Sequence, residues 1–209
     1  GDKLHKLARI LMSKHPQEMY LRLASHWDAP KSIVPGSEEI STLLTNSKRW
    51  ANIQDFTSTM MSLDMTCYLP DDILVKVDRA SMGVGLETRT PFLDHRVVEY
   101  AWKIPMHMKI RNNQGKWVLK QVLYKYVPKE LIERPKMGFA IPIDSWLKGP
   151  LRDWAEDLLS PDKLKNEGFL NPEPIRKVWL AHISGKENFQ HHLWDVLMFQ
   201  AWLMDQKRV

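Results

Sequence analysis

Apolar residues recur at helical spacing along almost the whole chain, whereas no strictly alternating segment is longer than a few residues. The clearest patterns lie in the second half. We expect helices starting at Gly149-Pro150 and at Asn171-Pro172, the second stopped by Gly185, and a last helix over about 190–205. The buried stripe predicted for that last helix is Trp194, Leu197, Met198, Ala201 and Trp202. The fold class is therefore predicted to be all-α, or nearly so, with residues 1–209 in a single helical domain.

The composition is that of an ordinary globular protein, with 44% hydrophobic and 26% charged residues. The net charge of +5 suits an anionic ligand such as a nucleotide, or a nucleic-acid surface, and does not decide between them. The single cysteine, Cys67, excludes an internal disulfide and fits a reducing compartment. No apolar run is long enough to cross a bilayer, and the first residues do not resemble a signal peptide. We therefore expect a cytoplasmic protein.

A charged stripe follows the Tyr-Leu-Pro sequence at 68–70, where Asp71 or Asp72 is predicted to cap a new helix. Asp72, Lys76 and Arg79 share one face of this helix because they are spaced four and seven residues apart. The neighbouring face is predicted to be buried, and it carries Ile73, Val77, Ala80 and Val84. The stripe is either a solvated surface with weak ion pairs or the wall of a ligand site. The sequence does not decide which of the two aspartates faces such a site.

The segment 86–94 reads Leu-Glu-Thr-Arg-Thr-Pro-Phe-Leu-Asp and places three ionisable groups around a proline turn. Glu87 and Arg89 are two residues apart on extended chain, so both are predicted to point the same way. Pro91 fixes its own φ angle and favours an extended residue before it, while Asp94 is a candidate N-cap for the next helix. Glu87 and Arg89 are therefore either a buried ion pair that fixes the turn or part of a site for phosphate or carboxylate groups.

A third group of charges lies in the segment 134–144, which glycine and proline make irregular. Lys136 lies two residues after Arg134 and two residues before Gly138, an arrangement that suits a loop closing over a phosphate. Its ammonium group would offset charge that develops on a phosphoryl group. The alternative is an ordinary surface loop. The sequence contains no Gly-x-x-x-x-Gly-Lys-Ser/Thr loop, and the adjacent His191 and His192 would point to different helix faces, so no metal site is predicted.

Five segments, taken in order, resemble the synthetase domain of glutamine-dependent asparagine synthetases. They lie at 68–82, 86–96, 115–120, 134–142 and 193–202, and the most distinctive read Leu-Glu-Thr-Arg-Thr-Pro-Phe-Leu-Asp-His-Arg and Arg-Pro-Lys-Met-Gly-Phe-Ala-Ile-Pro. The likeness runs from about residue 60 to the end, whereas residues 1–59 share only a general helical character. The resemblance implies the helical C-terminal portion of an α/β domain of the adenine-nucleotide α-hydrolase type, with its parallel sheet largely missing.

The resemblance also implies a chemistry. ATP, with Mg²⁺, would adenylate the side-chain carboxylate of aspartate, and ammonia from glutamine would displace AMP to give asparagine. Lys136 and Asp72 would be catalytic, the lysine on the ATP phosphates and the aspartate near the reacting carboxylate. Substrate or nucleotide binding would fall to Lys76, Arg79, Glu87 and Arg89. The expected partners are small molecules and an N-terminal glutaminase domain, with a homodimer as one option and no nucleic acid or membrane.

The sequence departs from the family pattern in three places. It lacks the Ser-Gly-Gly-x-Asp-Ser loop of the nucleotide site, a segment like Asp-Glu-Leu-Phe-Gly-Gly-Tyr, and the glutaminase cysteine. We therefore expect a fragment that is inactive by itself. One alternative is an amidotransferase that uses the same adenylation chemistry on a sugar carboxylate of surface polysaccharides. Another is a basic helical module that binds nucleic acid, which the dispersed charge and the absence of an aromatic-basic platform disfavour.

Overall fold

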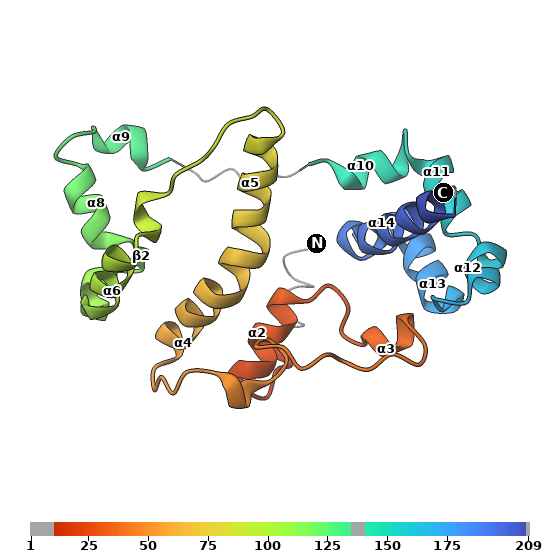
Figure 1. Ribbon diagram of the computed structural model, residues 1–209, viewed down its shortest axis with the longest axis horizontal. Coiled ribbons are helices and arrows are strands. Elements are labelled where there is room, and N and C mark those ends of the chain that lie inside the picture. Colours follow the sequence, from red (N-terminus) through yellow and green to blue (C-terminus); the bar gives the residue numbers. More distant parts are fainter. Residues whose placement is uncertain (1–10, 135–140, 208–209) are drawn as a thin grey trace. The chain divides into compact units, whose positions relative to one another are not determined.

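The computed structural model describes residues 11–134 and 141–207 (Figure 1). The chain divides into two units, which are described separately below. The first unit consists of Gly1–Leu74 together with Ile141–Val209, and the second consists of Val75–Ala140. That the whole chain forms one domain stays a prediction.

In its described parts the first unit contains helices joined by turns and irregular chain, and no strands. Its leading segment contains short helices, some of them 3₁₀ or π in character: α2 (Pro16–Ala24), α3 (Pro30–Ile33), η1 (Ser47–Arg49), α4 (Phe56–Leu63) and η2 (Asp64–Leu74). Its closing segment contains the helices α10 (Ile143–Lys148), α11 (Arg152–Leu158), α12 (Pro161–Glu167), α13 (Pro172–Ile183) and α14 (Gln190–Gln206). The helices expected after Gly149-Pro150, after Asn171-Pro172 and over about 190–205 are all present.

The second unit is also mainly helical. Its elements are α5 (Val75–Met82), η3 (Pro91–Leu93), α6 (His95–Lys103), α7 (Met106–Lys109), β1 (Ile110–Arg111), β2 (Gln114–Gly115), α8 (Trp117–Leu123) and α9 (Lys129–Ile132). The strands form an antiparallel hairpin in which Asn112 and Asn113 both have positive φ angles, as a tight hairpin turn requires. This hairpin is the only sheet in the described part of the chain, so the prediction of a nearly all-α fold is confirmed.

The closing helices of the first unit pack around one hydrophobic core. Its central residues are fully buried and come from every helix of the group, among them Leu147, Leu158, Leu164, Trp179 and Leu197. The core also receives Ile33 from α3, which lies far away in sequence. Two hydrogen bonds fix α3 there, because the backbone N–H of Asn171 donates to the Ile33 carbonyl at 2.8 Å and its side-chain amide donates to Ser32 O at 3.1 Å. The same Asn171 caps α13.

The buried face of α14 differs from the predicted stripe. Leu193, Val196, Leu197 and Leu203 are buried, whereas Trp202 is 56% exposed and Met198 is 39% exposed. The stripe is rotated because a polar residue, Gln200, occupies the buried face. Its amide N–H group donates to the Leu158 carbonyl at 3.2 Å and to a Glu167 carboxylate oxygen at 2.7 Å, so the buried amide nitrogen is satisfied. Apolar spacing alone does not reveal such a position.

The helix boundary predicted after the Tyr-Leu-Pro sequence at 68–70 is wrong. The helical chain does not stop at Tyr68-Leu69-Pro70, and neither Asp71 nor Asp72 begins a new helix, because all of them lie inside the π-helical segment η2. The wider turn of a π-helix accommodates Pro70, which lacks the N–H that an α-helical ladder needs. In the same segment α4 begins after Asp55, whose side chain accepts a hydrogen bond from the Ser58 backbone N–H.

The second unit differs from the first in the burial of its side chains. None of its described residues, 75–134, is buried. Val77, Ala80 and Val84, which the sequence predicts to be buried, are exposed, and Val84 is 81% exposed. Ile73, which belongs to the first unit, is half-buried. The apolar side chains of α5 therefore do not form a core with other parts of this unit. Within the described ranges, no helix combines the length and apolar character that a bilayer crossing needs.

Candidate functional site

The stripe of predicted site residues lies on η2 and α5. Asp72 is in the last turn of η2 and is half-buried, while Lys76 and Arg79 lie on α5 and are exposed. Lys76 and Arg79 are three residues apart on one α-helix, so they share a face as predicted. The π-helical segment places Asp72 where a local change of helical register occurs, a feature that is frequent at functional sites. Of the three residues, only Lys76 and Arg79 are therefore aligned on a regular α-helix.

The turn at 86–94 forms largely as its sequence predicts. Arg89 Nη2 and Glu87 Oε1 are 2.5 Å apart, and the arginine Nη1 also donates to the Thr88 carbonyl at 3.1 Å. The pair is not buried, because the two side chains remain 75% and 71% exposed. Thr90 is extended before Pro91, with φ −115° and ψ 92°. Glu87 and Arg89 therefore point the same way on an accessible surface.

Asp94 is the N-cap of α6, as predicted. One carboxylate oxygen accepts a hydrogen bond from the Arg96 backbone N–H at 2.9 Å, and the Arg96 guanidinium donates to both carboxylate oxygens. The hydrogen bonds from the Arg96 side chain and backbone hold the pKa of Asp94 below its usual range. Asp94 therefore serves as a helix cap.

A carboxylate that the sequence analysis did not single out lies just before the segment with Lys136. Glu133 Oε1 accepts hydrogen bonds from Lys120 Nζ of α8 at 2.6 Å and from the hydroxyl of Tyr124, the residue that follows α8. The Lys120 contact, followed by that of Tyr124, holds the pKa of Glu133 below its usual range. The hydrogen bond to Glu133 raises the pKa of Tyr124 to about 12. Lys136 itself lies outside the described residues.

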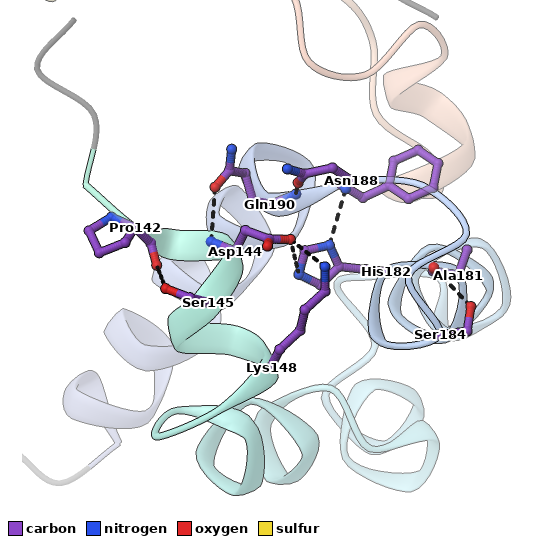
Figure 2. A network of polar contacts seen from close by, with 10 residues as sticks. Pro142, Asp144, Ser145, Lys148, Ala181, His182, Ser184, Asn188 and Gln190 are labelled. Atoms are coloured by element: carbon purple, nitrogen blue, oxygen red, sulfur yellow. Dashed lines mark hydrogen bonds and ion pairs between the residues drawn. The ribbon is translucent and has the colours of Figure 1, made fainter. Parts of the chain in front are cut away.

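A second network lies just after that segment, at the start of α10 (Figure 2). The Asp144 backbone N–H donates to Gln190 Oε1 at 2.9 Å, and its carboxylate accepts from Lys148 Nζ at 2.6 Å. His182 of α13 is fully buried, with Nε2 at 3.7 Å from the same carboxylate oxygen. The sequence signal for this histidine was its place on the buried stripe of Ile175 and Trp179, at a spacing of seven and three residues.

Two of the hollows in the described part of the chain lie on the first unit. The larger has a volume of about 730 Å³ and is lined by residues that include Trp27, His26, Phe189 and His191. His26 Nδ1 is 2.8 Å from Asp195 Oδ2, and its ring stacks on that of His191. The smaller, of about 390 Å³, lies between residues 16–17 and 47–59. Neither includes a predicted site residue, so the structure does not gather those residues in either hollow.

The described ranges contain no group of three or more His, Cys, Asp or Glu side chains arranged to hold a metal ion. Of the residues predicted to act together, the structure brings Glu87 and Arg89 into contact and places Lys76 and Arg79 on one helix face. The arrangement offers cations and carboxylates on accessible surfaces, which suits the recognition of charged small molecules.

The sequence matches the family described as Asparagine synthase over residues 1–204. The glutamine-hydrolysing asparagine synthetase 1 of Bacillus subtilis is 29% identical over 161 residues, which are 77% of this chain and 24% of that protein. The glutamine-hydrolysing asparagine synthetase 3 of the same organism is 45% identical over 147 residues, covering 64% of this chain and 24% of the relative. The human glutamine-hydrolysing asparagine synthetase is 30% identical over 137 residues, covering 58% and 24%.

The chain therefore spans 24% of the length of each of these three relatives. No solved structure matches it. The family match begins at residue 1, so it includes residues 1–59, for which the sequence analysis found only a general helical likeness. Because the match covers nearly the whole sequence and every motif described above, the chain belongs to the asparagine synthase family.

Proposed function

We propose that this chain is the helical part of an ATP-dependent synthetase that converts aspartate to asparagine with ammonia released from glutamine. The observation that carries the proposal is the ordered succession of five motifs inside a family match over residues 1–204. The three relatives described above are named for asparagine synthesis and glutamine hydrolysis, which are activities of those proteins.

In the proposed reaction, a side-chain carboxylate oxygen of aspartate attacks the α-phosphorus of ATP, and pyrophosphate leaves. Ammonia then attacks the acyl carbon of the adenylate and loses a proton, and AMP leaves with the electrons of the broken C–O bond. The first step moves negative charge onto pyrophosphate, so positive groups near the phosphates lower its barrier. Mg²⁺ bound to ATP would supply part of that charge.

We assign Lys136 to the ATP phosphates and Asp72 to the surroundings of the reacting carboxylate, with Lys76 and Arg79 lining the site and Glu87 and Arg89 shaping it. The exposure of Lys76 and Arg79 on one face of α5 supports this assignment, as does the exposed Glu87–Arg89 pair. Charges held for fold stability alone gain little from such exposed positions, since an exposed ion pair contributes under about 1 kcal/mol.

The bonds of Glu133 give further support for the role of the segment that follows it. Lys120 and Tyr124 hold this carboxylate three residues before Lys136. These contacts fix residue 133, from which the chain continues to Lys136, and a positioned cation stabilises charge better than a mobile one. The sequence 1–209 lacks the family's Ser-Gly-Gly-x-Asp-Ser loop, so we propose that these residues turn over ATP only together with that loop.

The substrate is tested in the complete protein that contains this chain by measuring pyrophosphate release from ATP. The arms of the experiment offer aspartate, a uronic acid, and no acceptor, each with ammonia or glutamine. We expect release with aspartate and stoichiometric formation of asparagine. Release with the uronic acid alone would replace asparagine synthesis with the amidation of a sugar carboxylate.

Lys136 is tested by the substitution Lys136→Ala in the same protein. Loss of one charge-stabilising group should slow pyrophosphate formation by about 10²- to 10³-fold, while glutamine hydrolysis continues. Lys125→Ala, which removes an exposed lysine from the chain after α8, is the matched control and should keep the full rate. Near-normal synthesis by Lys136→Ala would mean that the segment serves only as scaffold.

A further inference from the structure

The excess positive charge of this protein is concentrated in residues 100–129 of the second unit, which we call the basic segment. Between Glu99 and Glu130 the sequence contains no aspartate or glutamate, but it contains seven basic residues: Lys103, Lys109, Arg111, Lys116, Lys120, Lys125 and Lys129. The whole chain has a net charge of only +5, so the rest of the sequence is slightly negative. Lysines and arginines occur along the whole sequence, and this even spread hides the local excess.

The basic segment folds into adjoining elements rather than into an extended tail. It contains the end of α6, then α7, the β1–β2 hairpin and α8, and it ends with the first residue of α9. Helix α7 packs against both β1 and α8. Helices α6 and α8 and strand β2 lie side by side in green in Figure 1. The basic residues are therefore gathered on one group of neighbouring elements.

Aromatic rings hold two of these cations in place. Lys109 Nζ lies 5.2 Å from the ring centre of Trp102, and this contact joins the ends of α7 and α6. The guanidinium carbon of Arg111 lies 4.8 Å from the ring centre of Trp117, which joins β1 to the start of α8. A cation–π contact orders a side chain without cancelling its charge. The structure thus combines rings and cations in a way that the sequence pattern did not reveal.

Most cations of the basic segment have no acidic partner in the described ranges. Among the seven, Lys120 alone forms an ion pair there, with Glu133. In the first unit, by contrast, lysines of α10 and α12 pair with nearby acids. Five of the basic residues are exposed: Lys103, Arg111, Lys116, Lys125 and Lys129. Like charges gathered without counter-charges repel one another and attract anions, so this surface favours a partner with many negative charges.

The backbone of Lys116 has an uncommon conformation. Its φ of 60° and ψ of 30° lie in the left-handed region, which asparagine and glycine enter readily but a lysine enters at a cost in energy. The turn just before it has asparagine at both of its left-handed positions, Asn112 and Asn113. Backbone geometry therefore does not explain a lysine at 116. Such outliers are frequent at functional sites.

We propose that the basic segment is a binding surface for single-stranded nucleic acid. Lysine and arginine side chains neutralise the phosphates of such a strand, and exposed aromatic rings stack on its bases. Tyr100 and Tyr126 lie in the segment and are 69% and 81% exposed. An acidic protein segment would also neutralise the cations, but it would give these rings no stacking partner. The inference is independent of the proposed synthetase reaction.

The test uses the complete protein that contains this chain and a fluorescein-labelled oligothymidylate of about 16 nucleotides, a length that covers one binding domain. Binding is measured by fluorescence anisotropy over a range of salt concentrations. The double variant Lys116→Asn with Lys125→Gln removes two exposed cations, and asparagine tolerates the left-handed backbone at 116. The matched control is Lys165→Gln with Lys177→Gln, which removes two exposed lysines of the first unit.

We expect binding that weakens linearly with the logarithm of the salt concentration. Each lost phosphate contact removes about 0.7 from that slope, so the variant of the basic segment should lower it by about 1.4 and weaken binding by about tenfold. The control should match the wild type. Tyr126→Ala should weaken binding by about 5- to 100-fold through lost stacking, with the slope unchanged. All the substituted side chains of the segment are exposed, so none of these changes removes a buried contact.

Polyglutamate of similar charge, offered as a competitor, separates nucleic acid from an acidic protein partner. We expect it to compete weakly, because it has no bases to stack. Absence of binding, or equal losses in the two double variants, would overturn the proposal. Competition as strong as that of unlabelled oligothymidylate, together with normal binding by Tyr126→Ala, would also overturn it. Pyrophosphate release with aspartate tests the proposed function separately, so the two can fail independently.

Discussion

The closing helices of the first unit and the second unit contain similar apolar side chains but use them differently. Helices α10–α14 bury Leu147, Trp179, Leu197 and their neighbours almost completely. In the second unit, Leu86, Phe92, Val84 and Tyr100 are all exposed, and no described residue is buried. Apolar residues recur at helical spacing in both regions, so this spacing alone does not create a hydrophobic core. A core forms where apolar stripes from several helices face one another.

The charged residues show the same contrast. In the second unit two ion pairs are local, Glu87 with Arg89 and Asp94 with Arg96, whereas Lys120 of α8 pairs with Glu133, the residue after α9. In the first unit, Glu156 joins two helices, because Arg176 Nη2 donates to it at 2.6 Å and the Trp179 indole N–H donates to its other oxygen. The Glu156 pair thus supports packing between two buried helices, whereas the Glu87–Arg89 pair lies along one exposed turn and remains accessible to ligands.

The largest expected effect that tests this contrast is on stability. Leu197→Ala leaves a cavity in a fully buried site and should lower the free energy of unfolding by about 2–5 kcal/mol. The matched substitution Leu119→Ala, at a side chain of α8 that is 47% exposed, should cost under about 1 kcal/mol. Both are measured by urea unfolding followed by circular dichroism. Equal losses would mean that the second unit has a core of its own.

An intermediate effect is expected from the helix caps. Asn171→Ala removes the cap of α13 and the hydrogen bond to Ser32 O, and should cost about 1–2 kcal/mol in urea unfolding. It should also release α3, so amide exchange should rise over 30–33. Asp94→Ala, the corresponding cap in the second unit, should raise exchange only in α6. Faster exchange at 30–33 in Asp94→Ala would show that the two regions are coupled.

The smallest expected effect concerns the pKa values of two glutamate side chains. The pKa values of Glu133 and Glu156 should both lie below the ordinary 4.5 in a carbon-detected NMR titration. For Glu156, burial alone raises the pKa, but the hydrogen bonds from Arg176 and Trp179 outweigh it. Lys120→Met should raise the midpoint of Glu133 and leave that of Glu156 unchanged. A shift of both would contradict independent charge networks.

The sign of the pH dependence follows from those directions. Both carboxyl groups have folded-state pKa values below their unfolded values. Their contribution to stability is therefore complete above the unfolded pKa and is lost as the pH falls through the folded pKa. Acidification below about pH 4.5 should weaken both networks.

Much of the fold follows from local sequence signals. Gly185, with a φ of 72°, ends α13 where expected, Asp94 caps α6, and the Asn112-Asn113 turn forms. These features depend only on residues that are close in sequence, so they can be predicted from a single sequence. Pro70 was misjudged because whether a helix breaks or widens at proline depends on the surrounding chain.

The candidate site was predictable only in part. Spacing placed Lys76 with Arg79, and Glu87 with Arg89, because both pairs are local. The links of His182 to Asp144, and of Gln190 to the same residue, join positions about 40 residues apart in sequence, and nothing in the local pattern of either residue names its partner. Gln200 on α14 is the same kind of case, since only the distant Leu158 carbonyl and Glu167 explain its burial.

The hydrogen bond from the Asn171 amide to Ser32 O joins residues 139 positions apart. During synthesis on a ribosome, α3 emerges long before the helices that receive it, and the whole of 75–140 emerges in between. The leading segment must therefore remain without its final partners until α13 and α14 have left the exit tunnel. Release of a truncated product before α14 would leave Ile33 exposed to water and to other nascent chains.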